Sequence, residues 1–503
     1  MNQQIEAIMN EPSFEYDVRS LLRAFFPHAE VFFRSALNAD KRRDTDRFYA
    51  LFSAGSMLIS WNESKWRGVS TYGFDRAAVK NELKRTLYDL LSAELSQSLP
   101  WGTLTGIRPV KLALKQVNGG ASRRQVRDYL YETYRVSEKK ADLAYAIAQR
   151  EKRVIESFPL EDGYCLYVGI PFCPSICLYC SFSSYPMEAY RDRVDAYMKA
   201  LFVEIEETAR MCEGRPLSAV YVGGGTPTSL AAGQLSALME KIASSFDLSR
   251  LREWTVEAGR PDSITEDKLL TLKELPGIRI SINPQTFRQQ TLDTIGRRHT
   301  VEETKEAFRM ARGLGFADIN MDLIVGLPGE GEAEVAVTLK EVAALGPDNL
   351  TVHSLALKRA SRLREEWERF GEDSFHQSDR IMEMVHRTAE EMAMEPYYLY
   401  RQKDIAGNLE NVGFAKKGRE GIYNILIMEE VADIVACGAG AISKRVGWIN
   451  WPVRGESGRS DEAEIVQRSR RPEKTTRAAN VKDVDQYIDR VEEMIRRKRE
   501  LFS

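Results

Sequence analysis

Three cysteines stand close together with the spacing C-x3-C-x2-C, at Cys173, Cys177 and Cys180. Cysteine thiolates are the usual protein ligands of iron–sulfur clusters. A loop of this length can bring three thiolates to three irons of one [4Fe–4S] cluster and leave the fourth iron open to a small molecule. The alternative is a structural zinc site, which needs four ligands. The next candidate ligands, Cys212 and His299, are distant in the sequence, so the spacing favours a cluster.

Strands and helices alternate from residue 164 onward, and the cysteine segment directly follows the first of these strands. The six candidate strands are 165–170, 219–222, 254–258, 279–283, 319–325 and 350–355, with helical stretches such as 191–211 and 301–314 between them. Six such units in series predict an α/β fold whose parallel sheet is rolled into a full or partial barrel. In such folds the chemistry takes place at the carboxyl ends of the strands.

The remaining sequence predicts two further parts around this barrel. Residues 1–158 combine short β-like runs with a helical period from Asp75 onward, and Ser122 and Ser137 stand where helix N-caps are expected. We therefore expect an N-terminal α+β accessory domain over 1–158 and the core barrel over 159–365. Residues 366–503 are predicted to form a mostly helical C-terminal lid or extension, with helical patterns at 376–400 and 481–501.

Composition limits the class of protein. The chain has 503 residues, a formal net charge of −3 and 43% hydrophobic residues, which indicates a folded protein of several domains and disfavours a general nucleic-acid binder. No apolar run reaches the roughly 18–20 residues of a membrane span. The first residues lack the pattern of a signal peptide. We expect a cytoplasmic protein, in which clustered cysteines serve metal or redox chemistry before disulfides.

The cysteine spacing resembles the signature of the radical S-adenosylmethionine (SAM) enzymes. Within them, residues 164–445 resemble the oxygen-independent coproporphyrinogen III oxidase group, which includes haem chaperones. The motifs that carry the resemblance occur in the same order as in the group: Tyr167-Val-Gly-Ile-Pro-Phe-Cys173, Tyr179-Cys180, Gly223-Gly-Gly-Thr-Pro-Thr228, Asn283-Pro-Gln-Thr-Phe287, Gly296-Arg297, the segment 321–328 and Gly438-Ala-Gly-Ala-Ile442. Segments 100–111 and 398–404 resemble a long branch of the group, the HemZ-type coproporphyrinogen dehydrogenases.

The resemblance implies a radical-SAM partial (β/α)6 barrel with a [4Fe–4S] cluster and SAM as cofactors. Cys173, Cys177 and Cys180 would ligate the metal and, with Glu257, form the catalytic set. The SAM contacts carried over by matching positions are Tyr167, Tyr179, Gly224, Gly225, Thr226, Glu257, Gln285, Arg297, Asp322, Ala356 and Ile442. Two alternatives stay open for these residues: the glycines are also explained by a tight β/α turn, and the three charged residues by internal salt bridges.

The group's reaction would make this chain an oxidoreductase of haem biosynthesis. An electron from a partner such as flavodoxin or ferredoxin cleaves SAM, and the resulting radical takes a hydrogen atom from a propionate of coproporphyrinogen III. The propionate then loses CO2 and one electron to give a vinyl group. Arg401 and Lys403 could meet such propionates. Phe182, however, stands where the group's oxidases carry a fourth cysteine, and this favours a haem-binding delivery chaperone. A radical SAM enzyme on another substrate is the third possibility; a nucleic-acid substrate is not expected.

Overall fold

The N-terminal lobe is a five-stranded sheet covered by two helices. The computed structural model describes residues 3–27, 29–35, 45–105, 108–158, 163–182, 184–356, 361–366, 370, 378–402, 409–453 and 465–503. The lobe's strands follow the order β2-β1-β3-β4-β5. Their bounds are β1 Gln4–Met9, β2 Glu30–Ser35, β3 Asp46–Ser53, β4 Ser56–Trp61 and β5 Lys65–Ser70, and the helices are α1 Glu15–Phe25 and α2 Arg76–Leu95. Buried side chains between Ile5 and Leu99 form this lobe's own core.

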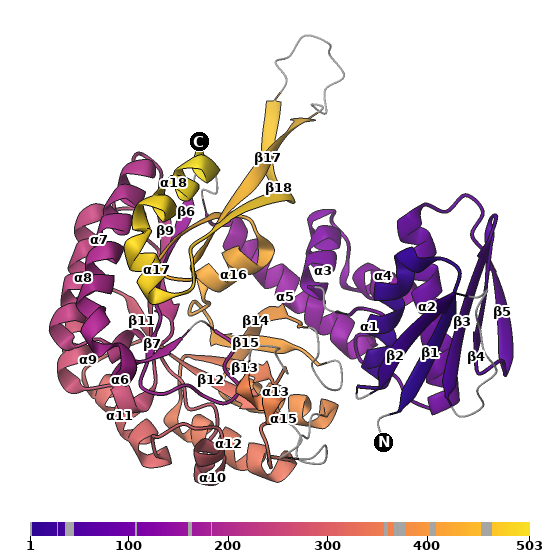
Figure 1. Cartoon of the computed structure of the whole chain (residues 1–503), viewed down its shortest axis with the longest axis horizontal. Helices are drawn as coiled ribbons and strands as arrows, with labels where there is room; N and C mark the ends of the chain where they lie inside the picture. Colours follow the sequence, from indigo (N-terminus) through magenta and orange to yellow (C-terminus); the bar gives the residue numbers. More distant parts are fainter. Residues whose placement is uncertain are drawn as a thin grey trace.

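Three further helices connect the lobe to the rest of the molecule (Figure 1). These are α3 (Pro109–Asn118), α4 (Arg123–Tyr134) and α5 (Glu138–Glu156). Ser122 and Ser137 cap α4 and α5 as predicted, because their hydroxyls accept backbone N–H groups of the first turn. The apolar side chains of all three helices belong to the same core as the barrel. The domain boundary near residue 158 stays a prediction.

The main sheet has eleven strands in the order β14-β15-β13-β12-β11-β10-β9-β6-β16-β17-β18. The six predicted strands are confirmed as β6 Tyr164–Ile170, β9 Leu217–Gly224, β10 Glu253–Gly259, β11 Ile278–Ile282, β12 Ile319–Val325 and β13 Asn349–Ser354, and they pair in parallel. A seventh parallel strand, β16 (Asp433–Cys437), lies beside β6. The edges of the sheet are β14 and β18, so the barrel is partial.

Helices cover the outer face of the curved sheet (Figure 1). The main ones are α7 Val194–Met211, α8 Ala232–Ser245, α9 Glu266–Lys273, α11 Val301–Gly313 and α12 Glu332–Leu345; the short helices are α6 Met187–Tyr190, α10 Gln289–Thr294 and α13 Arg362–Glu365. Their buried residues recur at three- and four-residue intervals, as helices that cover a sheet require. Within the described part of the chain, no helix is long and apolar enough to cross a membrane.

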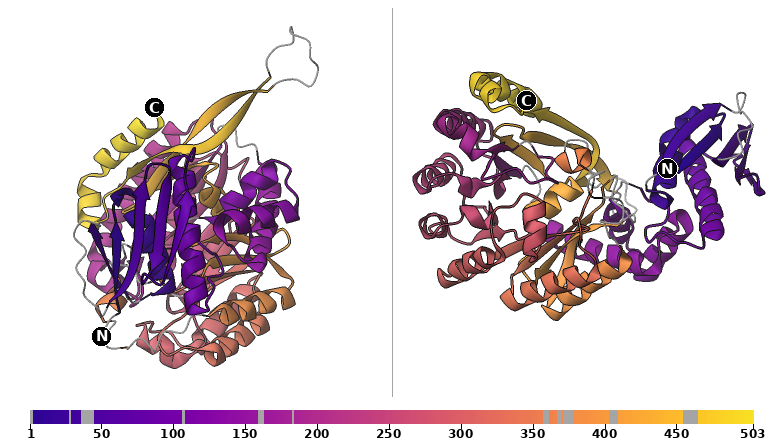
Figure 2. Two further views of the ribbon diagram at one scale, coloured as in Figure 1. Left: turned by 90° about the vertical axis from the view of Figure 1, so that its right-hand side faces the viewer. Right: turned by 60° about the horizontal axis from the view of Figure 1, so that its bottom comes forward.

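The prediction of a mostly helical C-terminal extension is wrong in detail. The region contains α15 Asp379–Glu391, α16 Ile422–Glu429, α17 Val484–Asp489 and α18 Val491–Phe502, but also β14 Met394–Tyr400, β15 Asn411–Lys416, β16, β17 Ile442–Val453 and β18 Ile465–Ala479. β14 and β15 pair antiparallel and extend the sheet past β13. β17 and β18 form a ribbon that projects away from the barrel (Figures 1 and 2). Strand pairing with the barrel therefore overrides the helical pattern at 394–400.

A buried ion pair attaches the last helix to the barrel. Lys498 of α18 is 1% exposed, and its Nζ lies 2.9 Å from Oε1 of the fully buried Glu204 in α7. The other carboxylate oxygen of Glu204 accepts the N–H of Gly438 at 2.8 Å. Because buried charges are stable only when paired and hydrogen-bonded, this network fixes α18, α7 and the turn after β16 relative to one another.

Candidate active site

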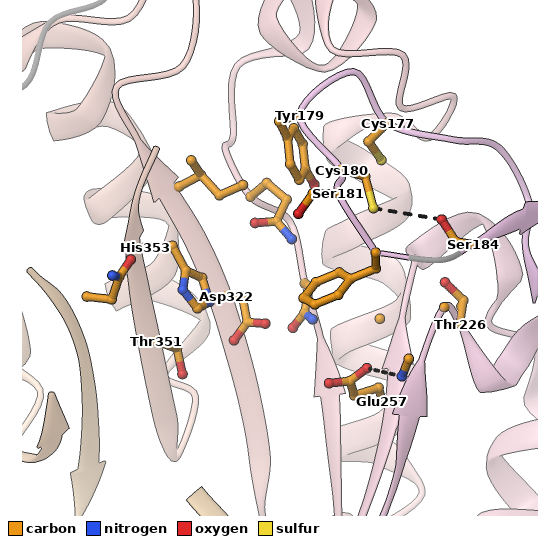
Figure 3. A pocket seen from close by; sticks show the side chains of 18 of the residues that line it. Cys177, Tyr179, Cys180, Ser181, Ser184, Thr226, Glu257, Asp322, Thr351 and His353 are labelled. Carbon is orange, nitrogen blue, oxygen red and sulfur yellow. Dashed lines mark hydrogen bonds between the residues drawn. The ribbon is translucent and has the colours of Figure 1, made fainter. Parts of the chain in front are cut away.

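A cavity of about 550 Å³ opens at the carboxyl ends of the parallel strands. Its lining comes from the cysteine loop after β6, from β9 to β15 and from α16, as expected for a barrel of this type. Figure 3 shows the side chains of Cys177, Cys180 and Glu257 on one side and those of Asp322 and His353 on the other. Twelve of the predicted site residues line this cavity: Cys173, Cys177, Cys180, Tyr179, Gly224, Gly225, Thr226, Glu257, Gln285, Arg297, Asp322 and Ala356.

The three cysteines lie on the loop that leaves β6, and each sulfur has a hydrogen-bonding neighbour. Cys173 accepts from Thr226 Oγ1 at 3.5 Å, and Cys180 Sγ lies 3.8 Å from Ser184 Oγ. Burial raises the pKa of the Cys173 thiol to about 11, so metal binding must release its proton. In the described part of the chain, no three Cys, His, Asp or Glu side chains converge on one ion position. Separated sulfurs suit a cluster, in which each thiolate binds a different iron.

The glycine segment after β9 lies against the root of the cysteine loop. The N–H groups of Gly225 and Thr226 donate to the carbonyls of Ile170 and Phe172 at 2.8 and 2.7 Å. A Cβ at Gly225 would lie only 2.7 Å from the Phe172 carbonyl oxygen, so a side chain cannot be accommodated there. Close backbone packing therefore explains why glycine is needed at Gly225, and Gly224 and Gly225 also line the cavity.

Glu257 is a carboxylate near the end of β10 that accepts from two donors and has no cationic partner among the described residues. Its Oε1 accepts the hydroxyl of Tyr221 at 2.5 Å, and its Oε2 accepts the N–H of Gly224 at 3.2 Å. Burial, and to a smaller extent the nearby charge of Asp322, raises the pKa of Glu257 to about 7 although both hydrogen bonds lower it. Glu257 is therefore partly protonated at neutral pH and would gain from a cationic ligand.

Arg297 is 3% exposed and contacts backbone oxygens rather than a carboxylate. Its guanidinium donates to the carbonyl of Asn283 at 2.8 Å and to the hydroxyl of Tyr179 at 3.1 Å. Among the described residues, neither Arg297 nor Glu257 nor Asp322 takes part in a salt bridge. Within the part of the chain that the structure describes, the internal salt bridges considered as the alternative are thus not formed, and the three side chains line the cavity.

Several buried polar atoms around the cavity have no partner in the described structure: Asn283 Oδ1, Gln285 Oε1 and Arg297 Nε. Gln285 also has a positive φ of 67°, which is uncommon outside glycine. Its backbone is held in this conformation by β12, because its N–H donates to the Asp322 carbonyl and its own carbonyl accepts from Ile324, both at 3.0 Å. Unsatisfied buried polar atoms are costly, so this region fits a ligand with both donors and acceptors.

Two predicted residues do not line the cavity. Tyr167 lies behind the glycine segment, with its hydroxyl 3.0 Å from the position of a Cβ on Gly224, and stacks with Tyr221 at 6.2 Å. Ile442, the first residue of β17, is 45% exposed. Arg401 also turns away: its guanidinium donates to the Leu104 carbonyl. Lys403, the other residue considered for propionate binding, lies outside the described residues.

Arg260 and Tyr400 line the cavity and were missed by sequence reasoning, whereas the alternation around His353 already allowed it to face the barrel interior. Arg260 donates to Cys177 Sγ at 3.4 Å. On the opposite wall His353 Nδ1 lies 3.1 Å from Tyr400 Oη, so this histidine both faces the cavity and has a partner. Arg260 could have been predicted as a site residue, because it is a charged residue that closely follows a predicted strand. Tyr400 could not, because its segment was predicted to be helical.

Comparisons with known proteins agree with this geometry. Residues 167–342 match the model of the radical SAM superfamily. The chain is 42% identical over 370 residues to the oxygen-independent coproporphyrinogen-III oxidase-like protein HemZ of Bacillus subtilis, covering 73% of this chain and 74% of the relative. It is 33% identical over 266 residues to the heme chaperone HemW of the same organism, covering 52% of this chain and 65% of the relative. The solved structure of coproporphyrinogen III oxidase (HemN) from Escherichia coli covers 68% of this chain and 72% of its own, with a TM-score of 0.50 and 24% identity.

The fold and the three-cysteine loop define a radical SAM protein. Within that class, the chain belongs to the family of oxygen-independent coproporphyrinogen-III oxidase-like proteins. The cofactors of this class are a [4Fe–4S] cluster and SAM, and the residues present fit both. Cys173, Cys177 and Cys180 supply three thiolates, and the cavity beside them offers a carboxylate and unsatisfied polar atoms to a zwitterionic ligand.

Proposed function

We propose that this protein is a radical SAM oxidoreductase that decarboxylates coproporphyrinogen III to protoporphyrinogen IX. The observation that carries the proposal is the position of the three cluster cysteines at one end of a cavity rich in polar and aromatic side chains. The 42% identity to a coproporphyrinogen-III oxidase-like protein supports the choice of substrate. When bound, the cluster and SAM supply a carbon radical that can take a hydrogen atom from an unactivated C–H bond.

In this proposal the chain's own residues bind and orient. Cys173, Cys177 and Cys180 hold the cluster. Glu257 would accept from a cationic group of SAM. Asp322, whose carboxylate accepts from Asn320 at 2.8 Å, would accept from the ribose hydroxyls. Tyr221, Tyr398 and Tyr400, with His353, form a wall of the cavity that would face the substrate and exclude water from the reacting atoms.

A haem-delivery chaperone is the second candidate, and one observation favours it. Phe182, in place of the fourth cysteine of the group's oxidases, lines the cavity and is 75% exposed. Exposed aromatic rings suit the flat face of a porphyrin. The 33% identity to the heme chaperone HemW also fits this function.

The product distinguishes the two candidates. Purified, cluster-loaded protein would be incubated without oxygen with coproporphyrinogen III, SAM and a reductant. An oxidoreductase releases CO2 and forms vinyl groups in proportion to the SAM consumed. Tight haem binding with intact propionates and no CO2 would establish the chaperone instead. If SAM is cleaved slowly but neither decarboxylation nor haem binding occurs, the radical SAM assignment stands and the tetrapyrrole substrate is excluded.

We further propose a cytoplasmic location and a flavodoxin or ferredoxin as electron donor. All six cysteines are free thiols in the structure, and the three ligands must stay reduced to bind the cluster. The electron donor is tested by mixing the protein with purified reduced flavodoxin or ferredoxin without oxygen and monitoring reduction of the cluster by its absorbance. If neither protein reduces the cluster, the proposed donor is wrong.

A further inference from the structure

Arg260 stands immediately after β10 and is 4% exposed. Its guanidinium reaches back to the cysteine loop, where Nη1 donates to Cys177 Sγ at 3.4 Å and to the Ser175 carbonyl at 3.2 Å. Nη2 donates to Ser175 Oγ at 3.1 Å. A single side chain thus contacts both the sulfur of one cluster ligand and the loop that carries it.

Asp262 fixes the orientation of this guanidinium. Its two carboxylate oxygens accept from Nε and Nη2 of Arg260 at 2.9 and 2.6 Å, which is the bidentate geometry of a strong pair. Burial lowers the pKa of Arg260, but the bond to Asp262 and the nearby Cys177 outweigh it, and the pKa is raised overall. The guanidinium therefore remains charged, and its remaining N–H groups are aimed at Ser175 and Cys177.

The other two cysteines have only neutral donors among the described residues. Thr226 donates a hydroxyl to Cys173, and Ser184 lies beside Cys180. Among the described residues, Arg260 is the one cation that donates a hydrogen bond to a sulfur of the three cluster cysteines. Hydrogen bonds and positive charge at the sulfurs of an iron–sulfur cluster stabilise its reduced, more negative state and so raise its reduction potential.

We propose that Arg260, held by Asp262, sets the reduction potential of the cluster: the guanidinium raises it through Cys177, and the carboxylate limits the rise. This inference rests on the proposed function only in that a cluster binds at the three cysteines. Arg260 is a positioning residue, since it acts on the cluster through the ligand Cys177 and lies on the cysteine side of the cavity.

The test measures the midpoint potential of the cluster in the full-length, reconstituted protein. One electron from dithionite reduces the cluster in the presence of mediators, and the reduced form is counted by electron paramagnetic resonance. Arg260→Met should lower the potential and Asp262→Asn should raise it, because the second change leaves the cation without its neutralising partner. Each shift should be at least about tenfold in the ratio of reduced to oxidised cluster, or about 59 mV for a one-electron couple. Arg298→Gln, which removes an exposed arginine near the same loop, is the matched control and should leave the potential unchanged.

If Arg260 and Asp262 tune the cluster, the midpoint potential shifts in opposite directions in the two variants. If they only support the fold of the loop, both variants bind less iron and their potentials do not shift in opposite directions. If Arg260→Met binds too little iron to titrate, Asp262→Asn alone decides, and an unchanged or lower potential in that variant overturns the proposal. Iron content of the wild-type protein is measured first. A wild type without a four-iron cluster would refute the proposed function, whereas a normal cluster with an unaltered potential in both variants would refute only this inference.

Discussion

Glu257→Gln should weaken SAM binding by an amount that depends on pH. The amide keeps the size of the side chain and an oxygen for the Tyr221 hydroxyl, which lies 2.5 Å from Glu257 in the wild type, but it loses the charge. A charge-assisted hydrogen bond is worth about 1.5–3 kcal/mol, so affinity should fall about ten- to a hundredfold where Glu257 is ionised. The pKa of Glu257 is raised to about 7, chiefly by burial.

The pKa gives the sign of the pH dependence. At pH 6 about one molecule in eleven carries the carboxylate, and at pH 8 about ten in eleven do. The groups that face Glu257 are Tyr221 of β9, Asp322 of β12 and Tyr167 of β6. Because the tyrosines keep their protons, with pKa values raised by burial, the carboxylate is the group that changes. The ratio of wild-type to variant affinity should thus rise about tenfold from pH 6 to pH 8.

Isothermal titration of SAM into cluster-loaded protein without oxygen measures this ratio at each pH. SAM's own ionisation affects both proteins equally and cancels in the ratio. Glu266→Gln, an exposed carboxyl in the first turn of α9, serves as the control and should match the wild type. The same ratio at pH 6 and pH 8 would refute the reasoning, since it would mean that Glu257 does not exchange its proton for the cationic ligand.

Three further outcomes are expected. Cys177→Ala should abolish cluster binding, measured as iron and sulfide per chain, whereas the buried Cys165→Ala should retain it; a retained cluster in the first variant would exclude the three-cysteine site. Asp322→Ala should weaken SAM about tenfold or more with an unchanged cluster spectrum, and unaltered affinity would make its role structural. Burial first, and then the charge of Glu429, raises the pKa of Glu151, and burial raises that of Glu429 to about 7. The folded protein thus keeps protons that the unfolded chain loses as pH rises from about 4.5 to 7, and stability should fall over this interval by about 3 kcal/mol for Glu429; Glu429→Gln should raise the melting temperature at pH 8 but not at pH 5, and an equal effect at both would contradict the sign.

The barrel could be predicted from sequence because each β/α unit repeats a strong pattern. Buried parallel strands are continuous apolar runs, and the helices between them show a clear period. β16 has the same apolar character but only five residues, and the helix before it, α16, has only eight. The sequences of β17 and β18 include many charged residues, so neither alternation nor apolar length marked them as strands.

The site was predictable where it is local and unpredictable where it depends on packing. The three cysteines lie within eight residues, so their spacing alone indicates a cluster. Strand ends also meet at one edge of a parallel sheet, which placed Glu257 and Asp322 in the same cavity. The contact of Arg260 with Cys177 joins residues 83 positions apart, and only the fold brings them together. Ile442 matched a motif by sequence, yet its strand turns it toward solvent.

The position of the cysteine loop is determined from both of its sides by distant residues. On one side, Arg260 binds Ser175 within the loop. On the other, Tyr197 of α7 donates to the carbonyl of Gly169 at 2.6 Å and accepts the N–H of Ala439 at 3.1 Å.

The turn at Gly438 and Ala439 is in turn held by Glu204, whose partner is Lys498 of the last helix. A Cβ on Gly438 would lie 2.4 Å from the Gly169 carbonyl oxygen, so the turn and the end of β6 touch without room for a side chain. The end of β6, where the cysteine loop begins, is therefore connected to α18 through this turn. We therefore expect cluster binding at the loop and docking of the last helix to stabilise each other through these contacts.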